Sequence, residues 1–214
     1  GDIPSEISNL TDLTYLSLDN NLLDDDIPSE IWDLSKLEFL YMQGNGFSGQ
    51  IDDDVSGLSN IIKLYLHDNQ LTGSIPSEIW GLSKLEELNL SLNNLSGLIS
   101  SDISQLQNLK SLDLNGNLLS GEVPNEISTL TSLTDLYLHD NQLSGELPAT
   151  ICNLSSINWA SDVSFNISGN RFCPDENSSY PDCIDGYEGL QTTTACFFPD
   201  VTCGNGEVEL WGEC

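Results

Sequence analysis

The stretch that decides the fold runs from Leu64 to Leu85 and reads LYLHDNQLTGSIPSEIWGLSKL. It opens with apolar residues at alternating positions, passes through an Asn and a Thr-Gly step, and then enters Ile-Pro-Ser-Glu-Ile. The pattern returns every 24 residues, and its asparagines are Asn21, Asn45, Asn69, Asn93, Asn117 and Asn141. Each unit supplies one short strand and one return segment, and no unit can bury its own leucines alone. We therefore predict a stacked solenoid.

Alternation predicts which side chains fill the core. Paired apolar residues such as Leu64 and Leu66 should point inward, and the residues between and beside them should line an open, concave face. The asparagine at each strand end should bond the turn backbone and stack as a ladder. Pro76 suits the first position of a helical turn, and Glu78 suits the positive end of the helix dipole. The expected fold class is an α/β solenoid with one short parallel strand and one short α- or 3₁₀-helical return per repeat.

The best-preserved units resemble a known family. Residues 119–124 (Leu-Ser-Gly-Glu-Val-Pro) and 143–148 (Leu-Ser-Gly-Glu-Leu-Pro) resemble the plant-type leucine-rich repeats of receptor-kinase ectodomains and polygalacturonase-inhibitor proteins. Related arrays occur in bacterial and algal surface proteins. The resemblance covers residues 1 to about 173. It implies a twisted leucine-rich repeat superhelix that binds proteins, peptides or glycans through its concave or lateral face.

The resemblance also implies a disulfide-stapled cap after the last repeat. Residues 170–173 (Asn-Arg-Phe-Cys), followed by Cys183, are similar to the Asn-x-Leu-Cys…Cys cap of such arrays, which implies a Cys173–Cys183 bridge. We accordingly expect a solenoid over residues 1–172. Residues 173–214 should form a cysteine-rich C-terminal cap and a linker to a further array.

The remaining cysteines are assigned by proximity. Cys203 and Cys214 should pair, which leaves Cys152 with Cys196, although six cysteines allow fifteen connectivities. Residues 211–214 (Trp-Gly-Glu-Cys) are similar to the stretch that opens plant-type arrays. Either a further array follows, or the last cysteines simply close a small loop.

The composition excludes several classes of partner. Five Lys and Arg residues stand against 34 Asp and Glu residues, a net charge of −29. Phosphate binding needs clustered cations, so we expect neither nucleic acid nor an anionic membrane as a partner. No apolar run approaches the roughly 20 residues of a membrane helix, so this segment should not insert into a membrane. Six cysteines favour an extracellular or cell-surface location.

Candidate ligand-binding residues lie on the open face. Four aromatic residues on three successive strands should form one patch: Tyr15, Phe39, Tyr41 and Tyr65. The strands after them add Glu87, Asp113, Asp135 and Tyr137. Core packing does not explain the rings, because the inward positions are already taken; a solvated ladder of flat side chains is the alternative. A rigid aromatic surface suits sugar faces or apolar side chains, and the acids favour a cationic or hydroxyl-rich ligand.

Two tryptophans are candidate interface residues on the return side of the array. Trp32 and Trp80 follow the inward Ile31 and Ile79, so we expect them to point outward or sideways and to anchor a contact. Self-association of arrays through them, or end to end, would fit a fibre.

No cofactor is expected, and the only metal candidate is calcium. Hard oxygen ligands in excess are what that ion requires, and they occur in two runs: Asp24, Asp25, Asp26 and Asp52, Asp53, Asp54. The runs occupy different places in their repeats, so convergence on one site is not expected.

One near-copy indicates duplication of a three-repeat block. LYLHDNQL occurs at Leu64–Leu71 and again at Leu136–Leu143. The two histidines of the chain, His67 and His139, would then lie roughly 14 Å apart, too far to share a metal ion.

The sequence contains no nucleophile motif, phosphate loop or metal-spaced Cys/His cluster, so we expect a non-enzyme. Two classes of function then remain. The first class is an extracellular recognition or adhesion module that binds a protein or glycan through its concave face. The second is a structural segment of a long surface protein or self-associating fibre. Two Asn-x-Ser sequons, at Asn89 and Asn166, fall on the open face. Either the source does not glycosylate them, or that face is not the binding site.

Overall fold

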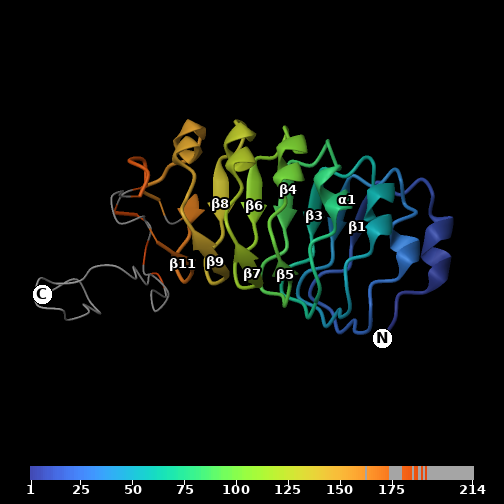
Figure 1. Ribbon diagram of the computed structural model, residues 1–214. Coiled ribbons are helices and arrows are strands. Elements are labelled where there is room, and N and C mark those ends of the chain that lie inside the picture. Colours follow the sequence, from blue (N-terminus) through green and yellow to red (C-terminus); the bar gives the residue numbers. More distant parts are fainter. Residues whose placement is uncertain (162, 174–179, 185, 188, 190, 192–214) are drawn as a thin grey trace, which may run out of the picture.

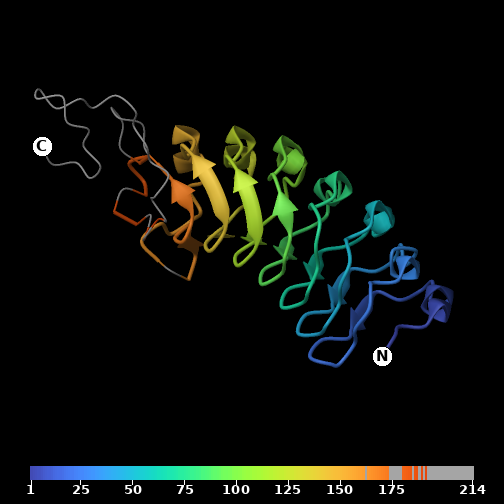
Figure 2. The ribbon, with the colours of Figure 1, turned by 60° about the horizontal axis from the view of Figure 1, so that its bottom comes forward.

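Every repeat adds one strand to the same sheet, and the repeats follow one another in a twisting row (Figures 1 and 2). The computed structural model describes residues 1–161, 163–173, 180–184, 186–187, 189 and 191. The strands of the seven-stranded sheet are β1 (Tyr15–Ser17), β2 (Phe39–Tyr41), β3 (Lys63–Tyr65), β4 (Glu87–Asn89), β6 (Ser111–Asp113), β8 (Asp135–Tyr137) and β10 (Phe165–Asn166). All pair in parallel with a register of one repeat, as Leu40↔Leu64 and Leu64↔Leu88 show. The predicted solenoid and its strand positions are confirmed.

A second sheet lies on the side of the array opposite the helical turns (Figure 1) and was not predicted. Its strands are β5 (Ser96–Gly97), β7 (Leu118–Gly121), β9 (Gln142–Gly145) and β11 (Arg171–Phe172). The Ser-Gly steps of the sequence are its signal. Gly121 has φ +76°, and a Cβ there would lie 2.5 Å from the Leu98 side chain of the preceding repeat. Glycine therefore suits this position by its conformation, and any other side chain would also have to displace Leu98.

The return segments are short helical turns along the other side of the array (Figure 1). They are η1 (Ser5–Asn9), η2 (Ser29–Ile31), η3 (Asp53–Gly57), α1 (Ser77–Trp80), η4 (Ser101–Gln105), η5 (Asn125–Thr129) and η6 (Ala149–Asn153). Proline occupies the N-cap, one residue earlier than predicted, as at Pro76. Asp52 and Ser100 take this place in the two units without proline, and their side chains accept from the N–H groups of Asp54 and Asp102. Side-chain capping thus replaces the fixed φ of proline.

The asparagine ladder joins each repeat to the one before it, as predicted. In Asn117, the side-chain amide donates to the carbonyls of Leu90, Leu114 and Asn115, and its oxygen accepts from the N–H of Leu95. Asn93, Asn117, Asn141 and Asn170 are buried. Burial without these four bonds would leave polar groups unsatisfied, so the position requires asparagine.

Trp32 and Trp80 do not point outward, and this prediction is wrong. They are 1 % and 0 % exposed and belong to the same continuous core as Leu40 and Leu64. A short helical turn lets two consecutive residues, such as Ile79 and Trp80, both face the core. The two rings therefore stabilise the stacking of the returns and offer no exposed interface.

The predicted disulfides of Cys152 and Cys183 are also wrong, because these two cysteines bond to each other. Their Cα atoms lie 5.6 Å apart, and the bond replaces both Cys173–Cys183 and Cys152–Cys196. Ile184 is fully buried in the core, which draws the chain before it back over the last repeat and brings Cys183 to η6. Cys173 is disulfide-bonded as well. Cys196, Cys203 and Cys214 lie outside the described residues, as does most of the range 173–214.

Candidate functional site

The four predicted aromatic residues lie together on the open face of the seven-stranded sheet. The ring centroids are 6.2 Å apart for Tyr15 and Phe39, 5.5 Å for Tyr15 and Tyr41, and 5.1 Å for Tyr41 and Tyr65. The register explains the contacts, because Tyr15 pairs with Phe39 and Tyr41 pairs with Tyr65. We call these four residues the aromatic cluster. Tyr15 is 56 % exposed and the other three rings are half-buried, so the cluster presents a fixed surface to solvent.

Glu87 belongs to the cluster's polar edge and is not a free acid. Its carboxylate lies 2.7 Å from the ammonium group of Lys63 and accepts a hydrogen bond from the hydroxyl of Tyr65. Burial alone would raise the pKa of Glu87, but the hydrogen bonds from Lys63 and Tyr65 outweigh it and lower that pKa. The same carboxylate raises the pKa of Lys63. Lys63 was missing from the predicted site, although the 24-residue register places it beside Phe39 and Glu87.

The remaining predicted residues lie farther along the same face. Asp113 lies between Asn89 and Tyr137 in the strand register, and Asp135 lies beside Ser111. Asp113 accepts hydrogen bonds from the backbone and side-chain nitrogens of Asn115, and Asp135 accepts from the hydroxyl of Thr134. Neither carboxylate forms an ion pair within the part of the chain that the structure describes. This half of the face therefore keeps accessible negative charge.

Two half-buried histidines extend the face and were not predicted as site residues. His67 lies 5.8 Å from the ring of Tyr65, and His139 lies 6.3 Å from the ring of Tyr137. Burial lowers the pKa of His67 because it disfavours the charged imidazolium. In both rings Nδ1 is buried without a hydrogen-bond partner in the described structure, as is the side-chain oxygen of Gln43. The register could have found them, since each lies two residues after an open-face tyrosine.

The sequons differ in exposure. Asn9, Asn94 and Asn153 are exposed, whereas Asn89 and Asn166 are half-buried and their side-chain oxygens accept from the N–H groups of Ser91 and Ser168. A sixth sequon, at Asn177, lies outside the described residues.

The calcium candidates do not form one site. Within the described residues, one group of acids has the spacing of metal ligands, and it joins Asp24 and Asp25 to Asp2, all three exposed. Asp52 instead caps a helical turn. Calcium binding stays an untested prediction, because exposed acids often cluster without an ion.

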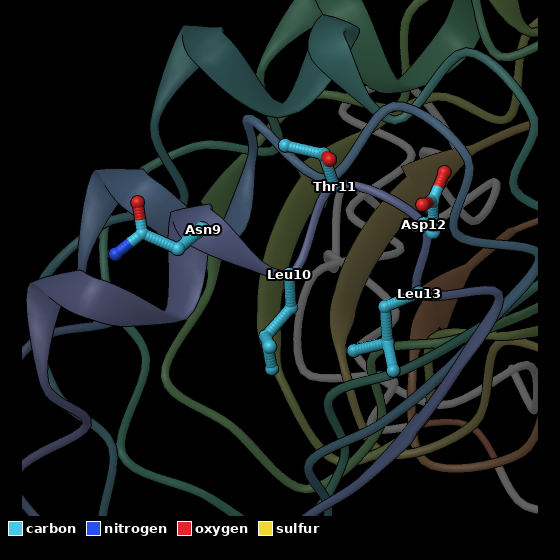
Figure 3. Close-up of a pocket in the computed structure, with 5 residues that line it drawn as sticks. All are labelled: Asn9, Leu10, Thr11, Asp12 and Leu13. Atoms are coloured by element: carbon cyan, nitrogen blue, oxygen red, sulfur yellow. The ribbon is translucent and has the colours of Figure 1, made fainter.

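A hollow of about 410 Å³ lies at the first repeat, lined by residues 9–13 (Figure 3). Leu10 is 50 % exposed, while its equivalents Leu34 and Leu58 are buried between neighbouring repeats. The hollow thus lies at an apolar edge that the corresponding residues of later repeats do not expose. End-to-end association through it stays a prediction.

Family models match most of the repeat region. The leucine-rich repeat models match residues 4–47 and 85–143, and residues 60–82. No curated protein gives a significant match. Among the described residues, no helix is long and apolar enough to cross a membrane.

Solved structures give close matches. The plant peptide hormone receptor RGFR1, solved in complex with RGF2, is 38 % identical with a TM-score of 0.76; the match covers 80 % of this chain and 27 % of that one. The Arabidopsis receptor kinase HAESA, solved with the peptide hormone IDA and the co-receptor SERK1, is 33 % identical with a TM-score of 0.80; the match covers 89 % of this chain and 31 % of that chain. The ectodomain of GASSHO1/SCHENGEN3 from Arabidopsis thaliana, solved with CASPARIAN STRIP INTEGRITY FACTOR 2, is 34 % identical with a TM-score of 0.83; the match covers 90 % of this chain and 23 % of that chain.

This chain therefore spans between about a quarter and a third of the length of those receptor chains. The repeat pattern, the seven-stranded parallel sheet, the second sheet and these matches agree. The chain belongs to the leucine-rich repeat family, in its plant-type form.

Proposed function

We propose that the chain is an extracellular, non-catalytic recognition module that binds a peptide segment through the aromatic cluster. The observation that carries the proposal is the fixed contact of four rings on a solvent-facing sheet. Such rings supply contact area with little loss of side-chain entropy on binding, because their orientations are already set. The three solved relatives bind peptides or protein factors, which supports this ligand class over a glycan.

The polar edge of the cluster supports the same function. Lys63 and Glu87 neutralise each other, so the acidic chain offers a locally balanced surface beside Tyr41 and Tyr65. A peptide that contacts the rings meets paired hydrogen-bonding groups there instead of unscreened charge. The acids farther along the face would select for a basic residue and make association depend on salt.

The test is a double variant, Tyr41→Ala with Tyr65→Ala. A displayed library of unstructured peptides and a glycan array are screened with the wild-type protein, and the binders are measured against the variant. We expect peptides to be selected and the variant to lose about 2 kcal/mol or more of binding free energy. The variant should stay folded, because neither ring is part of the buried core.

The matched control is Leu22→Ala with Leu98→Ala. These side chains are 92 % and 65 % exposed, and Leu98 lies against the second sheet. The control should bind like wild type. Loss of binding in the control, but not in the tyrosine variant, would move the site to the lateral surface. Selection of sugars alone would make the module a glycan binder.

A further inference from the structure

The open face contains one recognition unit twice. The first unit joins Tyr65, at the end of β3, and His67 just after it to Asn89, at the end of β4, and Ser91 just after it. The second joins Tyr137, at the end of β8, and His139 to Asn166, at the end of β10, and Ser168. The duplication therefore includes more than the repeated octapeptide, because the following strand supplies the same two residue types.

The two units share two internal contacts, although the hydroxyl of Ser91 also donates to Asn89 and that of Ser168 has no such bond in the described structure. In each, the tyrosine and histidine rings meet edge-on, at 63° and 81° between their planes. In each, the asparagine oxygen accepts from the N–H group two residues on, and its amide nitrogen has no hydrogen-bond partner among the described residues. Each histidine buries an unbonded Nδ1, which leaves Nε2 as the ring nitrogen that can meet a ligand. Both units thus present the N–H donors of an asparagine amide and an imidazole Nε2 beside an aromatic edge.

The spacing of the units fits an extended peptide. They are three strand steps apart in the order β3-β4-β6-β8-β10, which is about 14 Å at 4.7–4.9 Å per step. An extended chain advances about 3.4 Å per residue, so about four residues bridge the two units. In such a chain, side chains at positions i, i+2 and i+4 share one face.

The position midway between the units is occupied by β6, which carries Asp113. The first unit lies on β3 and β4 and the second on β8 and β10, so β6 is equidistant from both in the strand order. Asp113 has no cationic partner among the described residues. A basic side chain at position i+2 of the peptide would meet it.

We infer that the two units are equivalent subsites for one extended peptide. That peptide carries side chains with a hydrogen-bond acceptor (Asn, Gln, Ser or Thr) at positions i and i+4, and Lys or Arg at i+2. The inference rests on the proposed function and adds the spacing and chemistry of the ligand.

The test uses the peptide library described above, with wild-type protein produced without glycosylation. The selected sequences should share this pattern. Inserting one residue between i+2 and i+4 of a synthetic binder should weaken it about tenfold or more, because one subsite is lost. His67→Ala and His139→Ala should each weaken binding of the parent peptide by a similar factor. The inserted peptide already misses one subsite, so removing the histidine of that subsite should weaken its binding little further. Asp113→Asn should weaken only peptides with a basic residue and should reduce their salt dependence.

The double variant Leu22→Ala with Leu98→Ala is again the control, since both side chains are exposed and neither belongs to the two units or contacts Asp113 in the described structure. It should leave affinity for the parent peptide within about twofold. The insertion series needs only the wild-type protein, so a variant that unfolds does not remove the test.

The outcomes separate the two proposals. Suppose that the selected peptides lose affinity for the Tyr41/Tyr65 variant but share no pair of acceptor side chains at i and i+4, and bind His139→Ala as tightly as wild type. This result would overturn the paired subsites and leave the proposed function standing. If the library yields no binder, the proposed function fails and the inference fails with it. A glycan on Asn89 or Asn166 of the secreted protein, found by peptide mass mapping, would fill a subsite and also overturn the inference.

Discussion

The first three strands and the later strands of the open face differ, although the layer beneath them does not. β1, β2 and β3 carry the aromatic cluster, whose rings contact one another. β6 and β8 carry Asp113 and Asp135, whose carboxylates accept hydrogen bonds from Asn115 and Thr134, close neighbours in the sequence. Beneath both halves, the central leucine of each strand pairs with the next in one register. Side-chain alternation therefore lets the face change chemistry while the core stays constant.

The return side shows a second difference between the halves. Trp32 and Trp80 fill the core at one position of the return in the first half, where Ser56 stands in the repeat between them and Ser104 and Ser128 stand in the second half. Two repeats of the first half thus bury an indole ring at a position where these other repeats carry a serine.

The largest expected effect tests this difference between tryptophan and serine on the return side. Trp80→Ala should lower the free energy of unfolding by about 4 kcal/mol, because it empties a fully buried site. Ser104→Ala, one repeat later, should change it by about 0.5 kcal/mol or less. Urea unfolding of both variants measures the difference. A loss below about 1 kcal/mol in Trp80→Ala would mean that this ring is not a core residue after all.

The burial of Trp80 also shows where sequence reasoning stops. Strand positions, the asparagine ladder and the contact of Tyr41 with Tyr65 follow from a fixed period and from alternation, so they could be predicted. The direction in which the Trp80 side chain points depends on the geometry of a single helical turn, which the 24-residue repeat does not determine. The partner of Cys183 depends on how Ile184 packs against the last repeat, which is a tertiary contact.

The candidate site was predictable to the same extent. The strand register predicts that Tyr65 and Glu87 lie on neighbouring strands of the open face. Their hydrogen bond and the ion pair of Glu87 with Lys63 depend on side-chain rotamers, which the register does not determine. The second sheet was missed because its strands contain two to four residues with no alternation. Its signal is a glycine of positive φ, which sequence alone does not separate from an ordinary turn.

The next effect compares the middle of the ladder with its start. Asn117→Ala should cost about 2 kcal/mol of unfolding free energy, because it breaks four hydrogen bonds and leaves buried backbone groups unpaired. Asn21 is exposed and, within the described part of the chain, donates only to Leu18 and Asp19 of its own turn. Asn21→Ala should therefore cost about 1 kcal/mol or less. Equal losses would show that the bonds between repeats add nothing.

A smaller, pH-dependent effect concerns the polar edge of the aromatic cluster. The pKa of Glu87 lies below its ordinary value of 4.5, so its contribution to stability is fully present above that value and is lost as pH falls through the lower folded pKa. Glu87→Gln should cost about 1 kcal/mol at neutral pH. The difference from wild type should shrink at about pH 3. Thermal unfolding across this range is the measurement.

The control for Glu87 is a double-mutant cycle with Lys63→Met. Removing both partners should cost less than the sum of the two single losses, because no charge is then left without its partner. Strict additivity would show that the pair is only a surface contact.

The smallest effect compares the two copies of the repeated octapeptide. The hydroxyl of Tyr65 donates to the charged carboxylate of Glu87, whereas the hydroxyl of Tyr137 donates to the backbone carbonyl of Val163. Hydrogen bonds to charged acceptors contribute more, so Tyr65→Phe should cost about 1 kcal/mol and Tyr137→Phe about 0.5 kcal/mol. Each change keeps the ring and its contact with histidine, so peptide binding should change less than it does in the alanine variants. Urea unfolding resolves the stability difference, and the order of the two losses is the decisive result. If Tyr137→Phe costs more, then the carboxylate of Glu87 is held mainly by Lys63, and the two halves of the face differ less in their hydrogen bonds than their sequences indicate.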